Sequence, residues 1–154
     1  MDKIALVVDT NIVFSSILNP ASRIARVLVQ HHQYFDFYSC GFLQTELDGY
    51  SERIGILSGK SSDDIQRIRQ YVIKHITFID DALIPASMVQ RGYSYTREVD
   101  PNDTLFVALA LWLEAPLWTG DKKLLNGLQS MGFPLGISTP DVFSIVIERE
   151  MGQK

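Results

Sequence analysis

The sequence has little cysteine, no long apolar run and no excess of basic residues. Its one cysteine, Cys40, excludes an internal disulfide and fits a reducing compartment. The apolar runs are too short to span a membrane, and the N-terminal IALVVD is too short for a signal peptide. We therefore expect a cytoplasmic protein with no membrane association.

The absence of a basic excess bears on the partners of the chain. The net charge is −4, from 18 acidic and 14 basic residues, which argues against a strongly basic nucleic-acid binder. This exclusion weakens if several of the acidic residues hold cations, because bound cations would offset their charge. Nucleic acid therefore stays open as a partner, with binding routed partly through metal.

The length and composition predict one globular domain over residues 1–154. The chain is 46% hydrophobic and 21% charged, as in ordinary soluble proteins, and is long enough for a proper core. Strands alternate with helices along it, which favours a parallel sheet covered on both faces. The expected strands are 4–9, 35–40, 76–80, 116–119 and 134–138. The expected helices are 19–32, 41–57, 60–75, 100–113, 121–132 and 139–150, where 41–57 is one helix or a helix followed by a turn. Residues 81–99 are expected as a loop with one helical turn at most.

Several element ends carry capping signals. Ser61 or Ser62 should cap the 60–75 helix, and Asp100 should cap the next one, with Pro101 at its first position. Thr139 should cap the last helix. The 100–113 helix lacks a polar face, so it should lie buried against the sheet. The large residues expected in the core are Phe106, Trp112, Trp118 and Phe143.

Four acidic residues are the strongest functional signal. Asp9 and Asp121 each follow a short apolar strand, and Asp103 lies where a buried helix begins. Glu46 falls in the helix that follows the second strand. A carboxylate at the end of a buried element is costly unless something compensates it. In parallel sheets, sites form at the carboxyl ends of strands, so these acids most simply indicate a divalent metal site.

Each acid taken alone also has a structural explanation. Asp9 would cap a helix that begins at Thr10, and Asp121 would cap the expected helix over 121–132. Asp103 would complete a capping pair with Asp100, and Glu46 would be a solvated helix residue. The joint pattern favours the metal site, because the neighbours of the acids fit it too.

The motifs around the acids share one order along the chain. They are VVDTN, FLQTEL, DTLFVALA, WTGDKKLL and the closing STPDVF. In this order the chain resembles the PIN domain family, and within it bacterial PIN proteins described as toxins of toxin–antitoxin pairs. The resemblance covers essentially the whole chain. It implies a three-layer α/β/α Rossmann-like domain with a central parallel sheet of four to five strands, and a metal-dependent endoribonuclease.

The resemblance also implies roles for individual residues. Asp9, Glu46, Asp103 and Asp121 would carry the metal and the catalysis. Thr119 would support the site by hydrogen bonding, and Asn11 would contact Asp9 or a metal-bound water. Oxygen ligands without a Cys/His cluster suit Mg²⁺ or Mn²⁺.

The expected partners are RNA and a cognate antitoxin protein, and a homodimer is left open. Two cationic pairs would guide RNA to the site: Lys122 with Lys123, and Arg23 with Arg26. Tyr93 and Tyr95, in the expected 81–99 loop, would either stack on an RNA base or anchor that loop.

Three other functions are weighed against the toxin. A housekeeping RNA-processing nuclease would use the same site, and a catalytically idle PIN module would bind RNA or protein without cleaving. The DTN after the first strand also fits a phosphatase with an aspartate nucleophile, but such enzymes need a second aspartate where Asn11 stands.

Overall fold

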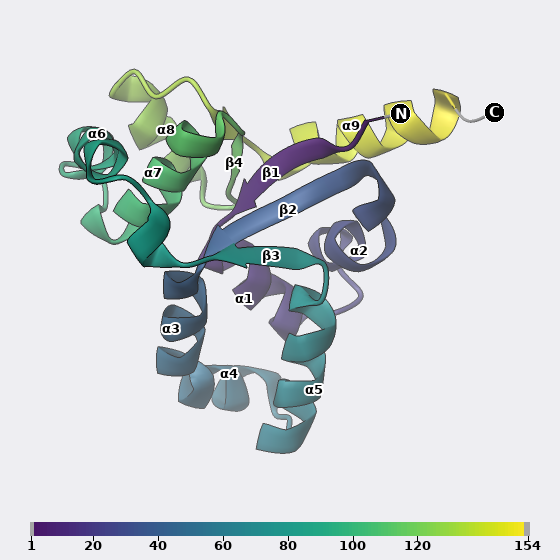
Figure 1. The fold of residues 1–154 in the computed structure, drawn as a ribbon. Coiled ribbons are helices and arrows are strands. Elements are labelled where there is room, and N and C mark those ends of the chain that lie inside the picture. Colours follow the sequence, from purple (N-terminus) through teal and green to yellow (C-terminus); the bar gives the residue numbers. More distant parts are fainter. Residues whose placement is uncertain (1, 153–154) are drawn as a thin grey trace.

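In the computed structural model, which describes residues 2–152, five parallel strands form one sheet in the order β3-β2-β1-β4-β5 (Figure 1). β1 lies in the middle, so the strand order reverses beside it. The strands are β1 Ile4–Val8, β2 Phe35–Cys40, β3 Ile76–Ile79, β4 Leu117–Trp118 and β5 Gly136–Ile137. All five match expected strands, with β4 and β5 shorter than predicted.

Helices cover both faces of the sheet and give the three layers expected from the resemblance. Figure 1 shows α1, α2 and α5 on one side and α6 and α7 on the other. The α-helices in residues 2–152 are α1 Thr10–Leu18, α2 Arg23–Gln30, α3 Gly41–Gly49, α4 Ser51–Ser58, α5 Ser62–Ile73, α6 Ala86–Thr96, α7 Thr104–Leu113, α8 Lys122–Ser130 and α9 Thr139–Gly152. Three short 3-10 turns occupy His32–Tyr34, Asp81–Leu83 and Pro101–Asp103.

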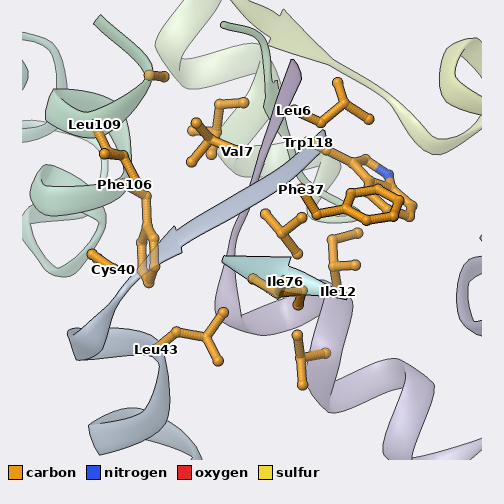
Figure 2. Packing of buried hydrophobic residues seen from close by; sticks show 14 of the residues in the cluster. Leu6, Val7, Ile12, Phe37, Cys40, Leu43, Ile76, Phe106, Leu109 and Trp118 are labelled. Atoms are coloured by element: carbon orange, nitrogen blue, oxygen red, sulfur yellow. The ribbon is translucent and has the colours of Figure 1, made fainter. Parts of the chain in front are cut away.

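The core lies on both faces of the central strands. Leu6 and Val7 are fully buried and, as neighbours in a strand, point to opposite faces. Figure 2 shows Phe37 and Trp118 on the side of Leu6, and Phe106 on the side of Val7. The rings of Phe37 and Trp118 lie 6.3 Å apart and extend the packing across the sheet. The buried apolar helix α7 fills the second face, as its lack of a polar side predicts.

Most predicted caps are present, and one is displaced. The Ser61 hydroxyl accepts from the Asp64 amide, and the Asp100 carboxylate accepts from the Asn102 amide. The expected cap of the last helix is wrong, because Thr139 is already helical and Ser138 accepts from the Asp141 amide instead. The Thr139 hydroxyl accepts a hydrogen bond from the Trp118 indole at 3.0 Å, so it has a different partner.

The expected loop at 81–99 is wrong, because it contains the helix α6. The buried residues of this helix are Gly92 and Thr96, while its apolar side chains Met88, Val89 and Tyr95 pack against the core only partly buried. It packs against α7 through close backbone approach: a Cβ on Gly92 would lie 2.9 Å from the Thr104 carbonyl oxygen. Thr96 adds a hydrogen bond to the Thr104 hydroxyl at 2.7 Å. Hydrophobic periodicity signals such a helix only weakly, because the residues at its closest contact with α7 are small.

Replacing Gly92 by alanine is expected to lower the free energy of unfolding by about 1–3 kcal/mol, because the added methyl would collide with the backbone of α7. Urea unfolding followed by circular dichroism measures the change. Gly55→Ala in α4 is the matched control, since its Cβ would meet only Ile65 at an ordinary 3.9 Å. The control should be neutral or gain up to about 1 kcal/mol from helix propensity. Equal effects of the two substitutions would contradict the close α6–α7 approach.

Two further expectations need correction. The helix α1, foreseen only as the alternative explanation of Asp9, is present and begins at Thr10. Trp112 is 37% exposed and does not belong to the core, because it lies near the end of α7. Phe106 and Trp118 are buried, and Phe143 packs against the core.

We find no single helix within residues 2–152 that is long and apolar enough to cross a membrane. The helices α1 and α2, joined by a bend of 104°, pass that test as a pair by length and composition alone.

Candidate active site

A cleft of about 260 Å³ opens at the carboxyl edge of the sheet. Asp9 follows β1, Glu46 lies in the helix after β2, and Asp121 follows β4, so three neighbouring strands deliver one acid each. Asp103 reaches the same cleft from the turn before α7. All four predicted acids line this cleft, and Asp100 joins them.

Asp9 is the deepest of these acids, with a side chain that is almost fully buried. Its carboxylate accepts from the Ile12 amide at 3.1 Å and so caps α1. It also accepts a hydrogen bond from the Thr119 side chain. Capping and lining the cleft are therefore compatible, since the cap fixes the direction of the carboxylate.

Thr119 connects two of the acids. Besides its bond to Asp9, its hydroxyl oxygen accepts from the Asp121 amide at 3.1 Å. The Asp121 carboxylate in turn accepts from the Leu124 amide and caps α8. Thr119 is itself buried. This single side chain thus holds the loop after β4 against the end of β1.

The other two acids are placed differently. Glu46 accepts from the Thr10 hydroxyl at 2.5 Å, a contact that joins α3 to the start of α1. It is not the freely solvated side chain of the alternative explanation. Asp103 stands before α7 but makes no side-chain capping hydrogen bond. Neither placement matches the structural alternative that the sequence offered.

The cleft is electrostatically unfavourable for its own carboxylates. Burial raises the pKa of Asp9 to about 7, against the lowering effect of its hydrogen bonds to Thr119 and Ile12. Burial, together with the negative charge of the neighbouring acids, raises the pKa of Asp103 to about 8. The pKa of Glu46 is raised by burial in spite of the bond from Thr10. These groups are held where each extra negative charge is costly.

The donor set fits a hard divalent cation. The acids that line the cleft supply only oxygen, and a bound cation would offset the repulsion that raises their pKa values. Over residues 2–152, however, no three His, Cys, Asp or Glu side chains are gathered into a ready-made ligand group. The acids surround one space without forming a closed cage.

Sequence reasoning missed one wall of this cleft. Phe14, Tyr50 and Arg53 line it on the side of α1 and α4. Nothing in the motifs marked them, although Phe14 and Tyr50 each lie four residues after a site residue, Thr10 and Glu46, and so one helical turn along. Asn11, which was predicted, lines the cleft as well.

The cationic candidates lie outside this lining. Lys122 and Lys123 are exposed at the start of α8, directly after Asp121. Arg23 lies over the Phe143 ring at 4.7 Å, where α2 meets α9, and Arg26 is exposed on α2. A role of these four in RNA binding stays a prediction.

The two tyrosines of the expected loop lie on the helix α6 instead. Tyr93 is exposed, and Tyr95 packs edge-on against Phe133 at 5.3 Å. Neither is among the residues that line the cleft, so the fold gives Tyr95 the anchoring role.

A comparison with protein families matches residues 7–144 to the PIN domain. The chain belongs to the PIN domain family. PIN domains are generally nucleases and typically use divalent metal ions, so membership supports a hydrolase acting on nucleic acid. The search of curated protein sequences found no significant match to this PIN domain.

Solved structures share the fold of this PIN domain at low sequence identity. A chain of VapBC2 from Rickettsia felis, bound to a DNA fragment from their promoter, has a TM-score of 0.61 at 15% identity, covering 88% of this chain and 97% of that one. PAE2754 from Pyrobaculum aerophilum has a TM-score of 0.65 at 14% identity, covering 94% and 88%. A PilT N-terminus domain protein, SSO1118 from Sulfolobus solfataricus, has a TM-score of 0.51 at 12% identity, covering 94% and 95%.

Proposed function

We propose that the chain is a Mg²⁺- or Mn²⁺-dependent endoribonuclease and the toxin of a toxin–antitoxin pair. One observation carries the nuclease proposal: the carboxylates of the four family motifs line one cleft at the carboxyl edge of the sheet. We assign metal binding and catalysis to Asp9, Glu46, Asp103 and Asp121.

The roles of the side chains follow from their contacts. A bound divalent ion would supply activation of a water and charge stabilisation at the phosphate. Thr119 keeps Asp9 and Asp121 in fixed relation through its two hydrogen bonds. The Thr10 hydroxyl donates to the Glu46 carboxylate and so fixes its position relative to the start of α1. Asp103 makes no capping hydrogen bond, so both of its carboxylate oxygens would be available to hold the ion. Asn11 lines the same cleft and would contact Asp9 or a metal-bound water.

The toxin proposal is supported by the subgroup that the motifs resemble and by the likeness in fold to a chain of VapBC2. A toxin of this class would act in the cytoplasm and be held inactive by its antitoxin. A homodimer is compatible with this proposal.

The nuclease proposal is tested with purified protein and a mixed-sequence RNA. Cleavage should appear with Mg²⁺ or Mn²⁺, disappear in a chelator and return when the metal is restored. A DNA strand of the same sequence tests the preference for RNA. Binding without cleavage under every metal condition would favour the idle module. Suppression of cleavage by a small protein encoded beside this chain would separate the toxin from a housekeeping nuclease.

Replacing both Lys122 and Lys123 by alanine is expected to weaken RNA binding and flatten its salt dependence. Each phosphate contact contributes roughly 0.7 to the slope of log affinity against log salt for single strands, so two contacts would remove about 1.4. Binding is measured across a salt series on an Asp9→Asn background, which prevents cleavage. Arg67→Ala with Lys60→Ala, both exposed and outside the cleft, is the control of equal charge. An unchanged slope would remove Lys122 and Lys123 from the RNA path.

A further inference from the structure

One side of the cleft is aromatic and cationic, unlike the acidic rest. The Arg53 guanidinium carbon lies 5.8 Å from the centroid of the Phe14 ring. The rings of Phe14 and Tyr50 meet edge to face, with centroids 5.6 Å apart and an angle of 75° between their planes. Tyr50 is 36% exposed, so part of its ring stands open to a ligand.

This group is mounted on the same helices as the site. Phe14 follows Thr10 by four residues in α1, and Tyr50 follows Glu46 by four at the end of α3. Residues four apart share a helix face, so the aromatic pair lies one turn, or roughly 6 Å, beyond the Thr10–Glu46 contact. The aromatic group therefore stands next to the carboxylates along the cleft.

Arg53 has a distinctive charge environment. Five carboxylates line the cleft, and Arg53 is the one cation among its lining residues in the described part of the chain. None of the ion pairs within residues 2–152 includes Arg53, and its contact is the face of Phe14. A cation that served only to neutralise the acids would be expected to pair with one of them. Arg53 instead remains available to an incoming anion.

We propose that Phe14, Tyr50 and Arg53 form a nucleotide subsite beside the carboxylates. This subsite would determine how an RNA strand lies in the cleft. A base would stack on the open aromatic surface, and Arg53 would bind the phosphate next to it. A polynucleotide is the ligand that offers a flat ring and a phosphate one nucleotide apart. The subsite rests on the proposed nuclease function and assigns specificity to α1 and α4.

The experiment separates base contacts from phosphate contacts. Full-length protein on the Asp9→Asn background is titrated, in Mg²⁺ buffer, with oligo(A) RNA and with an abasic strand of equal length and charge. The parent should prefer oligo(A) by about fivefold or more, the contribution of stacking one base. Phe14→Leu and Tyr50→Leu should each reduce that preference, because they keep apolar bulk and lose the aromatic face. Arg53→Ala should weaken both strands by a similar factor and lower the salt slope by roughly 0.7.

Matched controls come from α5. Tyr71→Leu changes an exposed tyrosine and Arg67→Ala an exposed arginine, both outside the cleft, and neither should alter preference or slope. An oligo(A) preference that survives both Phe14→Leu and Tyr50→Leu, or an Arg53→Ala variant that keeps the full slope, overturns the subsite. Cleavage by the protein with Asp9 intact is measured in parallel. If the protein with Asp9 intact cleaves RNA but the Phe14, Tyr50 and Arg53 variants keep the binding preference and the salt slope, only the subsite is rejected. If the protein with Asp9 intact neither cleaves nor binds RNA, the nuclease proposal itself is rejected.

Discussion

Replacing Asp9 by asparagine is expected to slow RNA cleavage by about 100-fold or more while leaving the fold intact. Loss of a residue that merely supports a metal ligand already costs 10–100-fold, and Asp9 is proposed as a ligand. The change removes one negative charge from the cleft without altering side-chain volume. The asparagine oxygen still accepts from the Ile12 amide, so the cap of α1 remains.

Initial cleavage rates at saturating Mn²⁺, together with the circular dichroism spectrum and thermal melt, test this expectation. Asp36→Asn is the matched control, because Asp36 is an exposed aspartate on β2 away from the cleft. The control should cleave at the parental rate. An Asp9→Asn variant that cleaves as fast as the control would show that Asp9 only caps a helix. A variant that loses both activity and its melting transition would instead assign Asp9 a role in folding.

The sheet could be predicted because its strands are signalled locally. β1 and β4 lie in short apolar runs, and the aspartates that follow them, Asp9 and Asp121, are visible in the sequence. General rules for parallel sheets place the carboxyl ends of the strands at one edge, so these ends could be expected to meet there, whereas the strand order itself comes from the structure. Glu46 joins the group through the order of the family motifs, so the four acids could be grouped from the sequence.

The helix α6 and the aromatic wall could not be predicted for the same physical reason. Both depend on contacts between separate helices, which the periodicity of one segment does not reveal. Gly92 reads as a turn residue until α7 is placed against it. Arg53 reads as a solvated charge until Phe14, on another helix, lies beneath it. Tertiary contact decides these positions, and a single sequence does not record it.

Replacing Asp103 by asparagine is expected to stabilise the metal-free protein, and increasingly so as the pH rises. Burial and the neighbouring acids raise the pKa of Asp103 from 3.8 to about 8. Because the folded state holds this proton more tightly, the contribution of Asp103 to stability is fully present below about pH 4 and is lost as the pH rises through about 8. Asparagine cannot ionise and avoids that loss. Between about pH 6 and pH 9 its advantage should grow by on the order of 2 kcal/mol, or about 4–8 °C in melting temperature.

Thermal melts of parent and variant, in chelator and in Mn²⁺, give the measurement, with Asp36→Asn again as control. Added Mn²⁺ should raise the melting temperature of the parent. At a Mn²⁺ concentration 100 times its dissociation constant, the free energy of unfolding should increase by about 2.7 kcal/mol. The Asp103→Asn variant should gain less stability from Mn²⁺ than the parent does. The stability advantage of the variant over the parent should therefore shrink or reverse when metal is present. A helix cap behaves differently: its loss costs about 0.5–2 kcal/mol, largely independent of pH above the carboxyl titration and of Mn²⁺. If Asp103→Asn destabilises the protein and Mn²⁺ does not change the melting temperature of the parent, Asp103 acts as a helix cap and not as a metal ligand. The absence of a capping hydrogen bond from its side chain argues against that outcome.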